Sequence, residues 1–138
     1  MDKNTQITGQ CYCGNIKYHS TGDILKMGIC YCRDCQRLTG GTALPFIVVL
    51  ADTLHVSGHI KELSRLGISG NSVHMAFCEQ CGSTLFGRFE EWPHIRTISA
   101  SSLDDSSQFS PDVQIWTKDA PEWMQLIHGI PQFERNAS

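Results

Sequence analysis

The sequence lacks the features of several protein classes. No run approaches the roughly 18 apolar residues that a membrane-spanning helix needs. The opening residues MDKNTQITGQ lack the basic and apolar regions of a secretion signal. Charged residues make up only 18% of the chain, the formal net charge is −3, and no basic cluster exceeds a residue pair, so the electrostatic footprint of a dedicated nucleic-acid-binding protein is missing. We therefore expect a cytoplasmic protein that binds neither membranes nor nucleic acid.

The remaining composition is that of a folded globular protein. Hydrophobic residues make up 41% of the 138 residues, whereas a disordered chain would be richer in charge and poorer in aliphatic side chains. The chain contains no internal repeat and no low-complexity linker. Since domains usually run to about 100–200 residues, we expect a single domain over residues 1–138.

The cysteines are the most informative feature of the sequence. Their number is odd, which argues against complete pairing in disulfides, and thiols stay reduced in the cytoplasm. Thiols at such short spacings are typical of metal ligands or catalytic groups, not of inert core residues. The seven form three clusters: Cys11 and Cys13; Cys30, Cys32 and Cys35; Cys78 and Cys81. This pattern predicts metal binding, with zinc preferred over iron, although a tetrahedral sulfur site holds either ion.

Seven thiols divide into a closed and an open zinc site. A structural zinc has four protein ligands, whereas a catalytic zinc has three and keeps one position for water or substrate. The two pairs Cys11/Cys13 and Cys78/Cys81 would complete the closed site, and Cys30, Cys32 and Cys35 would hold a metal from one side. The alternative is a second structural site with a histidine as fourth ligand. The candidates for that ligand are His19, His55, His59, His74, His94 and His128.

Short apolar stretches separated by turn residues predict a mostly β domain, a sandwich or folded-over sheet stapled by zinc. We expect strands at 16–19, 45–50, 54–56, 73–77, 84–89, 95–100 and 113–116, and a polar loop at 101–110. One helical turn at 34–38, closed by Gly40, would place Cys35 near a helix N-terminus, where thiolate is favoured over thiol. No long amphipathic helix is expected.

Three stretches of sequence carry a family resemblance: Cys11-Tyr12-Cys13-Gly14, then CYCRDCQRLTG at 30–40, then FCEQCG at 77–82. In order, spacing and trailing glycines they resemble the glutathione-dependent formaldehyde-activating enzyme (GFA) family. Trp116, Pro121 and Trp123 resemble the C-terminal segment of that family. The resemblance covers about 8–133.

The resemblance implies a fold, two metal sites and an activity. The fold is a small complex β-sandwich shared with the B-type methionine sulfoxide reductases. The implied structural zinc takes Cys11, Cys13, Cys78 and Cys81, and the implied catalytic zinc takes Cys30, Cys32 and Cys35. The implied activity is that of a carbon-sulfur lyase, which condenses formaldehyde with glutathione to S-(hydroxymethyl)glutathione and cleaves that product again.

An open zinc site would either bind the incoming thiol as thiolate or polarise the aldehyde carbonyl. We favour capture of the thiol. Three thiolates leave a net charge of −1 on the zinc complex, which weakens its Lewis acidity, whereas a soft thiol is a natural fourth ligand. The expected partners are therefore a small thiol such as glutathione and a small aldehyde.

Four further residues are candidates for substrate binding. Glutathione carries two carboxylates, so Arg33 and Arg37, the cations nearest to the open site in sequence, are expected to bind them. The alternative is that both arginines are solvated surface charge. Phe46 and Trp116 are candidates for aromatic walls of the pocket, and the alternative is that they belong to the core.

The chain departs from the family pattern at three positions near the open site. Tyr31 and Gln114 stand where a histidine is often found, and Gln36 stands where a basic residue is often found. The loss of imidazole removes the side chain best suited to proton transfer near neutral pH.

Two other classes of function compete with the lyase. The same fold would serve as a non-catalytic, zinc-stapled binding module for a thiol ligand or partner protein, and a closed second zinc site would favour that function. A thiol redox enzyme would need a reactive cysteine outside the metal sites, and no cysteine lies outside the three clusters.

Overall fold

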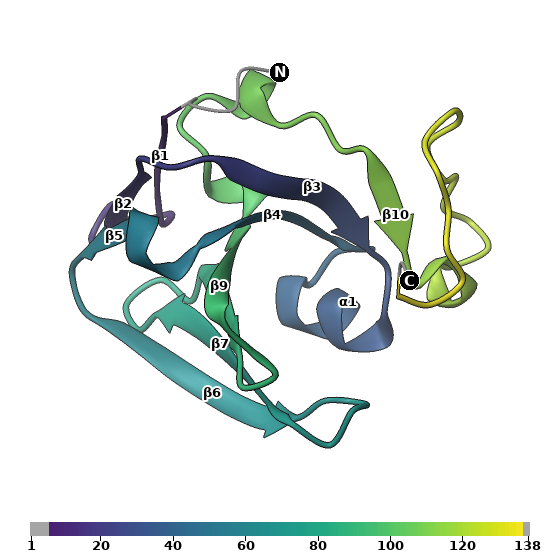
Figure 1. Cartoon of the computed structure of the whole chain (residues 1–138), viewed down its shortest axis with the longest axis horizontal. Coiled ribbons are helices and arrows are strands. Elements are labelled where there is room, and N and C mark those ends of the chain that lie inside the picture. The colour runs from purple at the N-terminus through teal and green to yellow at the C-terminus, as the bar shows by residue number, and fades with distance from the viewer. Residues whose placement is uncertain (1–5, 137–138) are drawn as a thin grey trace.

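The computed structural model describes residues 6–136 and confirms a mostly β fold. A small antiparallel sheet has the order β1-β2-β5, and a large sheet has the order β10-β3-β4-β9-β8-β7-β6 (Figure 1). The strands are β1 (Ile7–Gln10), β2 (Lys17–Ser20), β3 (Ile24–Cys30), β4 (Leu44–Leu50), β5 (Leu54–Ser57), β6 (Ile60–Leu66), β7 (Ser72–Cys78), β8 (Thr84–Phe89), β9 (Trp92–Ser99) and β10 (Val113–Ile115).

Helical structure is sparse. The expected helical turn at 34–38 forms the middle of α1 (Arg33–Thr39). Four short 3-10 helices complete the elements: η1 (Ala51–Thr53), η2 (Ala100–Ser102), η3 (Ser106–Gln108) and η4 (Thr117–Asp119). The expected polar loop at 101–110 contains part of η2 and all of η3. Within the described residues, no helix has the length and apolar character needed to cross a membrane.

The main hydrophobic core lies between the two sheets. Alternate residues of the strands point to it, as the period of two in a strand requires. The ring of Tyr18 from the small sheet meets the ring of Phe86 edge to face, with centroids 5.2 Å apart. The buried members of this cluster are Ile7, Cys11, Ile16, Tyr18, Met27, Ile47, Val49, Ala76, Cys78, Leu85, Phe86, Ile98, Ala100 and Leu103.

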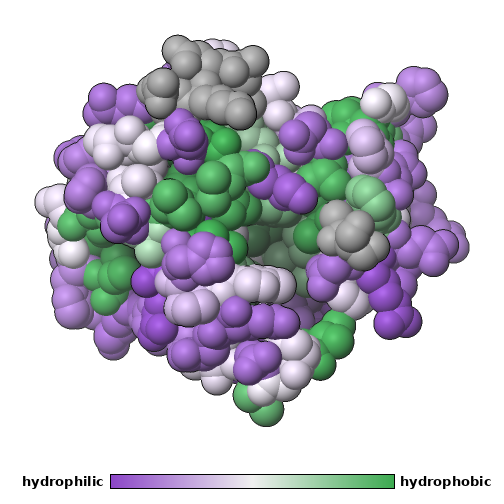
Figure 2. Space-filling view, viewed as in Figure 1, coloured by the Kyte–Doolittle hydropathy of each residue, from purple (hydrophilic) through white to green (hydrophobic). Residues whose placement is uncertain are grey.

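The opposite face of the large sheet is curved around α1 (Figure 1). An ion pair between Asp34 and Arg65 joins α1 to β6, and the hydroxyl of Thr84 on β8 donates to the carbonyl of Leu38 at 3.2 Å. Figure 2, in the same orientation, shows a hollow with apolar walls where Figure 1 shows the space between β4, β9 and α1. The helix therefore occupies the concave side of the sheet.

The chain after β10 forms a loop and returns to run beside that strand in the parallel direction, where Gln132 pairs with Gln114. β10 runs parallel to β3 and forms the end of the large sheet opposite to β6. The amide of Gln114 donates to the carbonyl of Pro131, and the amide of Phe133 donates to the carbonyl of Gln114, each at 2.9 Å. The C-terminal segment, defined here as residues 117–136, is thereby docked beside β10 (Figure 1).

Candidate metal centres

Two turns bring four cysteines together at one end of the molecule. Cys11 and Cys13 lie in the turn between β1 and β2, whereas Cys78 ends β7 and Cys81 lies in the turn between β7 and β8. The amide of Tyr12 donates to the hydroxyl of Ser83 at 2.9 Å, so the two turns also contact each other directly. The sulfur atoms of all four cysteines lie within 4.8 Å of one another.

The spacing of these sulfur atoms suits a tetrahedral ion. Zinc–sulfur bonds of about 2.3 Å place the ligands of a tetrahedral site roughly 3.8 Å apart. The observed separations are 3.6 Å between Cys11 and Cys13 and 3.8 Å between Cys13 and Cys78. This group of four cysteines, the four-cysteine group, fits a metal ion without rearrangement.

The surroundings of the four-cysteine group favour thiolate on two of its members. The Ser83 hydroxyl and amide donate to Cys81 and lower the pKa of its thiol to about 5. Burial raises the pKa of Cys11, but hydrogen bonds from the Ile16 amide, at 3.2 Å, and from neighbouring thiols outweigh it and lower the pKa overall. Metal ligands must be deprotonated, so both shifts favour binding. At Cys13 the amide of Asn15 lowers the pKa, but desolvation and hydrogen bonds with the other three thiols outweigh it and raise the pKa to about 11.

The other three cysteines converge at the start of α1. Cys30 ends β3, Cys32 is the residue that caps the helix N-terminus, and Cys35 lies in the first turn. Their sulfur atoms lie within 4.8 Å of one another, with Cys30 buried and the other two partly exposed. We call these residues the three-cysteine group.

Helix capping explains how this short sequence gathers three thiols. Cys32 has extended backbone angles, and its sulfur accepts from the amide of Cys35 at 3.3 Å, as an N-cap side chain does. Gly40 ends the helix in the left-handed conformation, at φ 71°, and its amide donates to the carbonyl of Gln36. The first turn of the helix brings Cys35 back over Cys32.

Within the three-cysteine group, the surroundings favour thiolate on Cys32. Hydrogen bonds from the thiols of Cys30 and Cys35, together with nearby backbone amides, lower the pKa of Cys32 to about 2. The hydrogen bond between Cys30 and Cys32 raises the pKa of Cys30 to about 12, and bonds to both neighbours raise the pKa of Cys35. A metal binding here would displace protons from Cys30 and Cys35.

No fourth side-chain ligand completes the three-cysteine group. Within residues 6–136, no histidine, aspartate or glutamate donor joins the three thiols within the same 4.8 Å. The histidine ligand considered as an alternative is therefore not in place in this structure. Three protein donors are the number that an open tetrahedral site uses.

The two candidate arginines lie on the surface of α1. Arg33 is exposed, and its guanidinium donates to the side-chain carbonyl of Gln36. Arg37 is exposed in the last turn of the helix. Both residues share the helix that carries Cys35, as expected from their positions in the sequence.

The two candidate aromatic residues lie on either side of β3. Phe46 on β4 is buried and faces Gly28, and Leu44 faces Cys30, so Phe46 and Cys30 share the concave face of the sheet. Trp116 is partly exposed after β10 in the left-handed conformation, at φ 57°. Its indole N–H donates to Asn136 at 2.8 Å. Phe46 is not part of the main core cluster.

A cavity of about 590 Å³ lies between α1 and the four-cysteine group. Leu38 and Thr39 of α1, Leu44 of β4 and Ser99 of β9 form one part of its wall, and Cys11 and Gly82 form another. The three thiols at the start of α1 do not line it. The cavity therefore borders Cys11 of the four-cysteine group and none of the three thiols at the start of α1.

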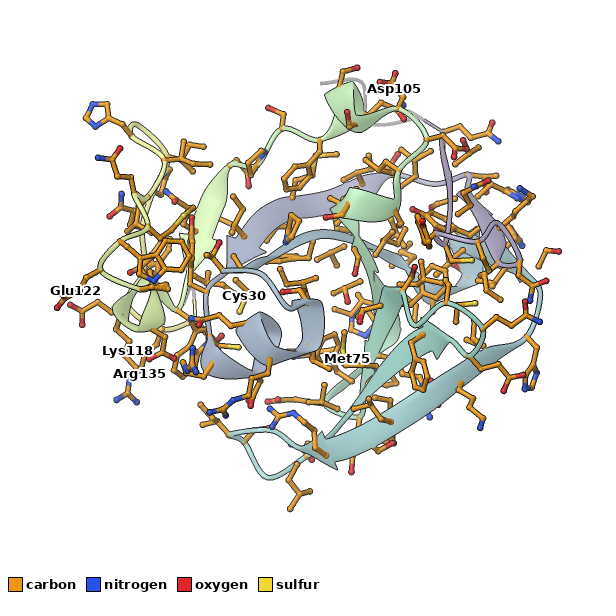
Figure 3. All side chains as sticks on the ribbon, turned by 180° about the vertical axis from the view of Figure 1, so that it is seen from behind. Cys30, Met75, Asp105, Lys118, Glu122 and Arg135 are labelled. Carbon is orange, nitrogen blue, oxygen red and sulfur yellow. The ribbon has the colours of Figure 1, made fainter. Side chains whose placement is uncertain are left out.

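Of the three residues that depart from the family pattern, Tyr31 contacts the other two. Tyr31, Gln36 and Gln114 are all buried and joined by hydrogen bonds. Sequence reasoning singled out each residue but gave no indication that they touch, because Tyr31 and Gln114 are 83 positions apart. Figure 3 shows the region from behind, with Cys30 near α1 and with Lys118, Glu122 and Arg135 on the neighbouring C-terminal segment.

Comparisons with known proteins identify the family. A crystal structure of a Rhodobacter sphaeroides protein superposes with a TM-score of 0.56 and 18% sequence identity, covering 70% of this chain and 87% of that one. A likeness at this identity concerns the fold alone. No curated protein matches the chain. The family model described as "Glutathione-dependent formaldehyde-activating enzyme" matches residues 6–119, and the chain therefore belongs to this family.

Proposed function

We propose that this protein is a zinc-dependent carbon-sulfur lyase or aldehyde-thiol adduct enzyme, similar to S-(hydroxymethyl)glutathione synthase. The observation that carries the proposal is the three-cysteine group, whose donors converge on one point and lack a fourth protein ligand among the described residues. Membership of the GFA family supports the same class of reaction. We further propose that residues 1–138 act as one cytoplasmic domain, with its core at about 8–133.

The proposal assigns two zinc ions to the chain. The four-cysteine group would hold a structural ion, because all tetrahedral positions are taken by protein. Cys30, Cys32 and Cys35 would hold a catalytic ion. When bound there, zinc supplies a site that stabilises an exogenous sulfur as thiolate at neutral pH.

The residues of the chain orient the reactants and keep water out. Cys30 and Phe46 are buried on the concave face of the sheet, so the inner side of the site is apolar. Arg33 and Arg37 are exposed on α1, where they would attract the carboxylates of glutathione. Trp116, at the outer end of β10, would border the site on the solvent side.

The overall reaction balances without an oxidant. The thiol sulfur bonds to the carbonyl carbon, the thiol proton leaves, and the carbonyl oxygen takes up one proton. The reverse reaction breaks the same carbon-sulfur bond. Among the described residues, no histidine donor lies with the three thiols, so we propose that the protons exchange with solvent.

Exchange spectroscopy at equilibrium tests the proposal. Formaldehyde and glutathione form their adduct spontaneously, so catalysis appears as faster interconversion between free and bound one-carbon signals in NMR. We expect zinc-loaded protein to accelerate this exchange, and Cys35→Ser protein, with its four-cysteine group intact, to lose the acceleration. A zinc-loaded protein that accelerates no thiol and aldehyde exchange would instead favour the non-catalytic binding module.

A further inference from the structure

Gln114 uses its full hydrogen-bonding capacity in the interior of the protein. Its side chain is fully buried, its oxygen accepts from the Tyr31 hydroxyl at 3.0 Å and the Ile127 amide at 2.9 Å, and its nitrogen donates to the carbonyls of Ile127 at 3.0 Å and Ile130 at 3.2 Å. An amide side chain offers two acceptor and two donor positions, so none is left over. The amide of Ile127 can only donate, which fixes the orientation of the side chain.

Gln36 makes a second connection of the same kind. Its nitrogen donates to the carbonyl of Tyr31 at 2.8 Å and to the carbonyl of Asp119 at 2.9 Å. Its oxygen accepts from Arg33. Gln36 directly follows Cys35, and Tyr31 lies between Cys30 and Cys32. Both connections therefore run from the backbone around the three thiols to the C-terminal segment.

The stretch that carries the thiols is held in place from several sides. β4 holds Cys30 on one side, through the pairing of Cys30 with Leu44, and β10 holds the amide of Tyr31, which donates to Ile115 at 3.0 Å. The side chains of Gln36 and Gln114 bind the same stretch to residues 119, 127 and 130. The stretch that carries the three thiols is thus hydrogen-bonded, directly and through Gln114, to the C-terminal segment.

We propose that Gln114 is a positioning residue for the three-cysteine group, acting through Tyr31, and that the docked C-terminal segment is part of that site. The metal chemistry in this inference rests on the proposed function, whereas the mechanical coupling does not. Loss of Gln114 would leave the Tyr31 hydroxyl and three backbone groups without their partners. The segment and the thiol loop would then loosen together, while the four-cysteine group would be unaffected.

The matched test compares Gln114→Leu with Gln125→Leu, in which the same change is made at an exposed position of the C-terminal segment. Hydrogen exchange measured by mass spectrometry should be about tenfold faster in Gln114→Leu, both at 119–133 and at 30–39, as expected for loss of a buried hydrogen-bond partner. In cobalt-loaded protein, release of the second metal equivalent should accelerate about as much, with a changed d–d spectrum. The first equivalent and the Gln125→Leu control should match the unmodified protein.

Faster exchange at 119–133 alone, with 30–39 unchanged, would overturn the inference. If Gln114→Leu does not fold, Tyr31→Phe replaces it, because this change removes a single hydroxyl and keeps the ring. It should change both readouts in the same direction by a smaller factor, and unchanged exchange at 30–39 would count against the inference. If the unmodified protein binds only one metal, the proposed function fails, yet the exchange data still decide whether the coupling exists.

Discussion

At the scale of single residues, Cys32 combines two tasks that are usually separate. Its sulfur caps α1 and is also one of the three candidate ligands. Hydrogen bonds from Cys30, Cys35 and two amides stabilise its thiolate, so the cap and the ligand depend on the same charge state. One side chain thereby caps the short helix α1 and would also anchor a metal ion bound there.

The charge state of Cys32 predicts an unusual pH profile for alkylation. A folded-state pKa of about 2, against 9.0 for the ordinary thiol, means that Cys32 stays thiolate throughout the range from about pH 5 to pH 8. In protein mildly chelated to empty the three-cysteine group, iodoacetamide should modify Cys32 first, at a rate nearly independent of pH. Peptide mass spectrometry locates the label. A rate that rises about tenfold per pH unit would contradict the assignment, because an ordinary thiol behaves in this way.

Gly28 provides the space in which Phe46 packs. A Cβ atom at this position would lie 2.6 Å from the Phe46 ring and 2.8 Å from the Val113 side chain. Gly28→Ala should therefore destabilise the protein by ~1–3 kcal/mol, the usual cost of overpacking. Gly41→Ala is the matched control, since its nearest atom would be 3.6 Å away. Urea denaturation measures both variants, and equal stabilities would show that Phe46 moves aside without cost.

At the scale of elements, the four-cysteine group joins hairpins that are distant in the sequence. Cys13 and Cys78 are 65 residues apart, and their turns belong to different sheets. Cys11 and Cys78 are also buried members of the main core. A metal here would therefore tie the small sheet to the large one at the edge of their shared core.

This arrangement predicts unequal effects of cysteine substitution on stability. Cys78→Ser should lower the melting temperature by roughly 10 °C or more, because losing even ~3 kcal/mol of the ~10–16 kcal/mol that a structural zinc contributes has that effect. Cys35→Ser removes one thiol from the other group and should lower it much less. Differential scanning calorimetry gives both values. A larger effect for Cys35→Ser would reverse the structural and catalytic assignments.

The sequence predicted the elements whose pattern is regular and missed those whose pattern is broken. Alternation or an apolar run marked strands at 45–50, 73–77 and 84–89, all of which are confirmed as β4, β7 and β8. β6 was missed because it is an edge strand with little burial, so its sequence IKELSRL has no buried face to reveal it. β3 was missed because a bulge between Ile24 and Lys26 and the glycine at 28 interrupt its alternation.

The candidate site was also predictable from the sequence only in part. Close spacing was enough to group Cys30, Cys32 and Cys35, because they lie at the end of β3, at the helix cap and in the first turn of α1. Spacing alone could not show that the two distant cysteine pairs share one site. That prediction depended on dividing seven thiols into four and three, and the structure places the sulfur atoms of the two pairs together. The contacts of Gln114 were beyond prediction, since they depend on β10 lying beside β3 and on the chain returning to run beside β10.

At the scale of the whole molecule, the two faces of the large sheet have different roles. One face packs against the small sheet and builds the main core. The other curves around α1 and carries Cys30, Leu44 and Phe46 outside that core. The four-cysteine group lies at the edge of the first face, and the three-cysteine group lies on the second. The fold thus separates the metal site that would stabilise it from the site that would act on substrate.

The measurement that tests this account most directly is the metal content per chain of protein purified without chelator, before and after Cys32→Ser. The account predicts two zinc ions in the unmodified protein and one in the variant, with the fold retained by circular dichroism. A single ion in the unmodified protein, unchanged by added zinc and by the substitution, would contradict it. The three-cysteine group would then hold no metal, and the catalytic role proposed for it would fail.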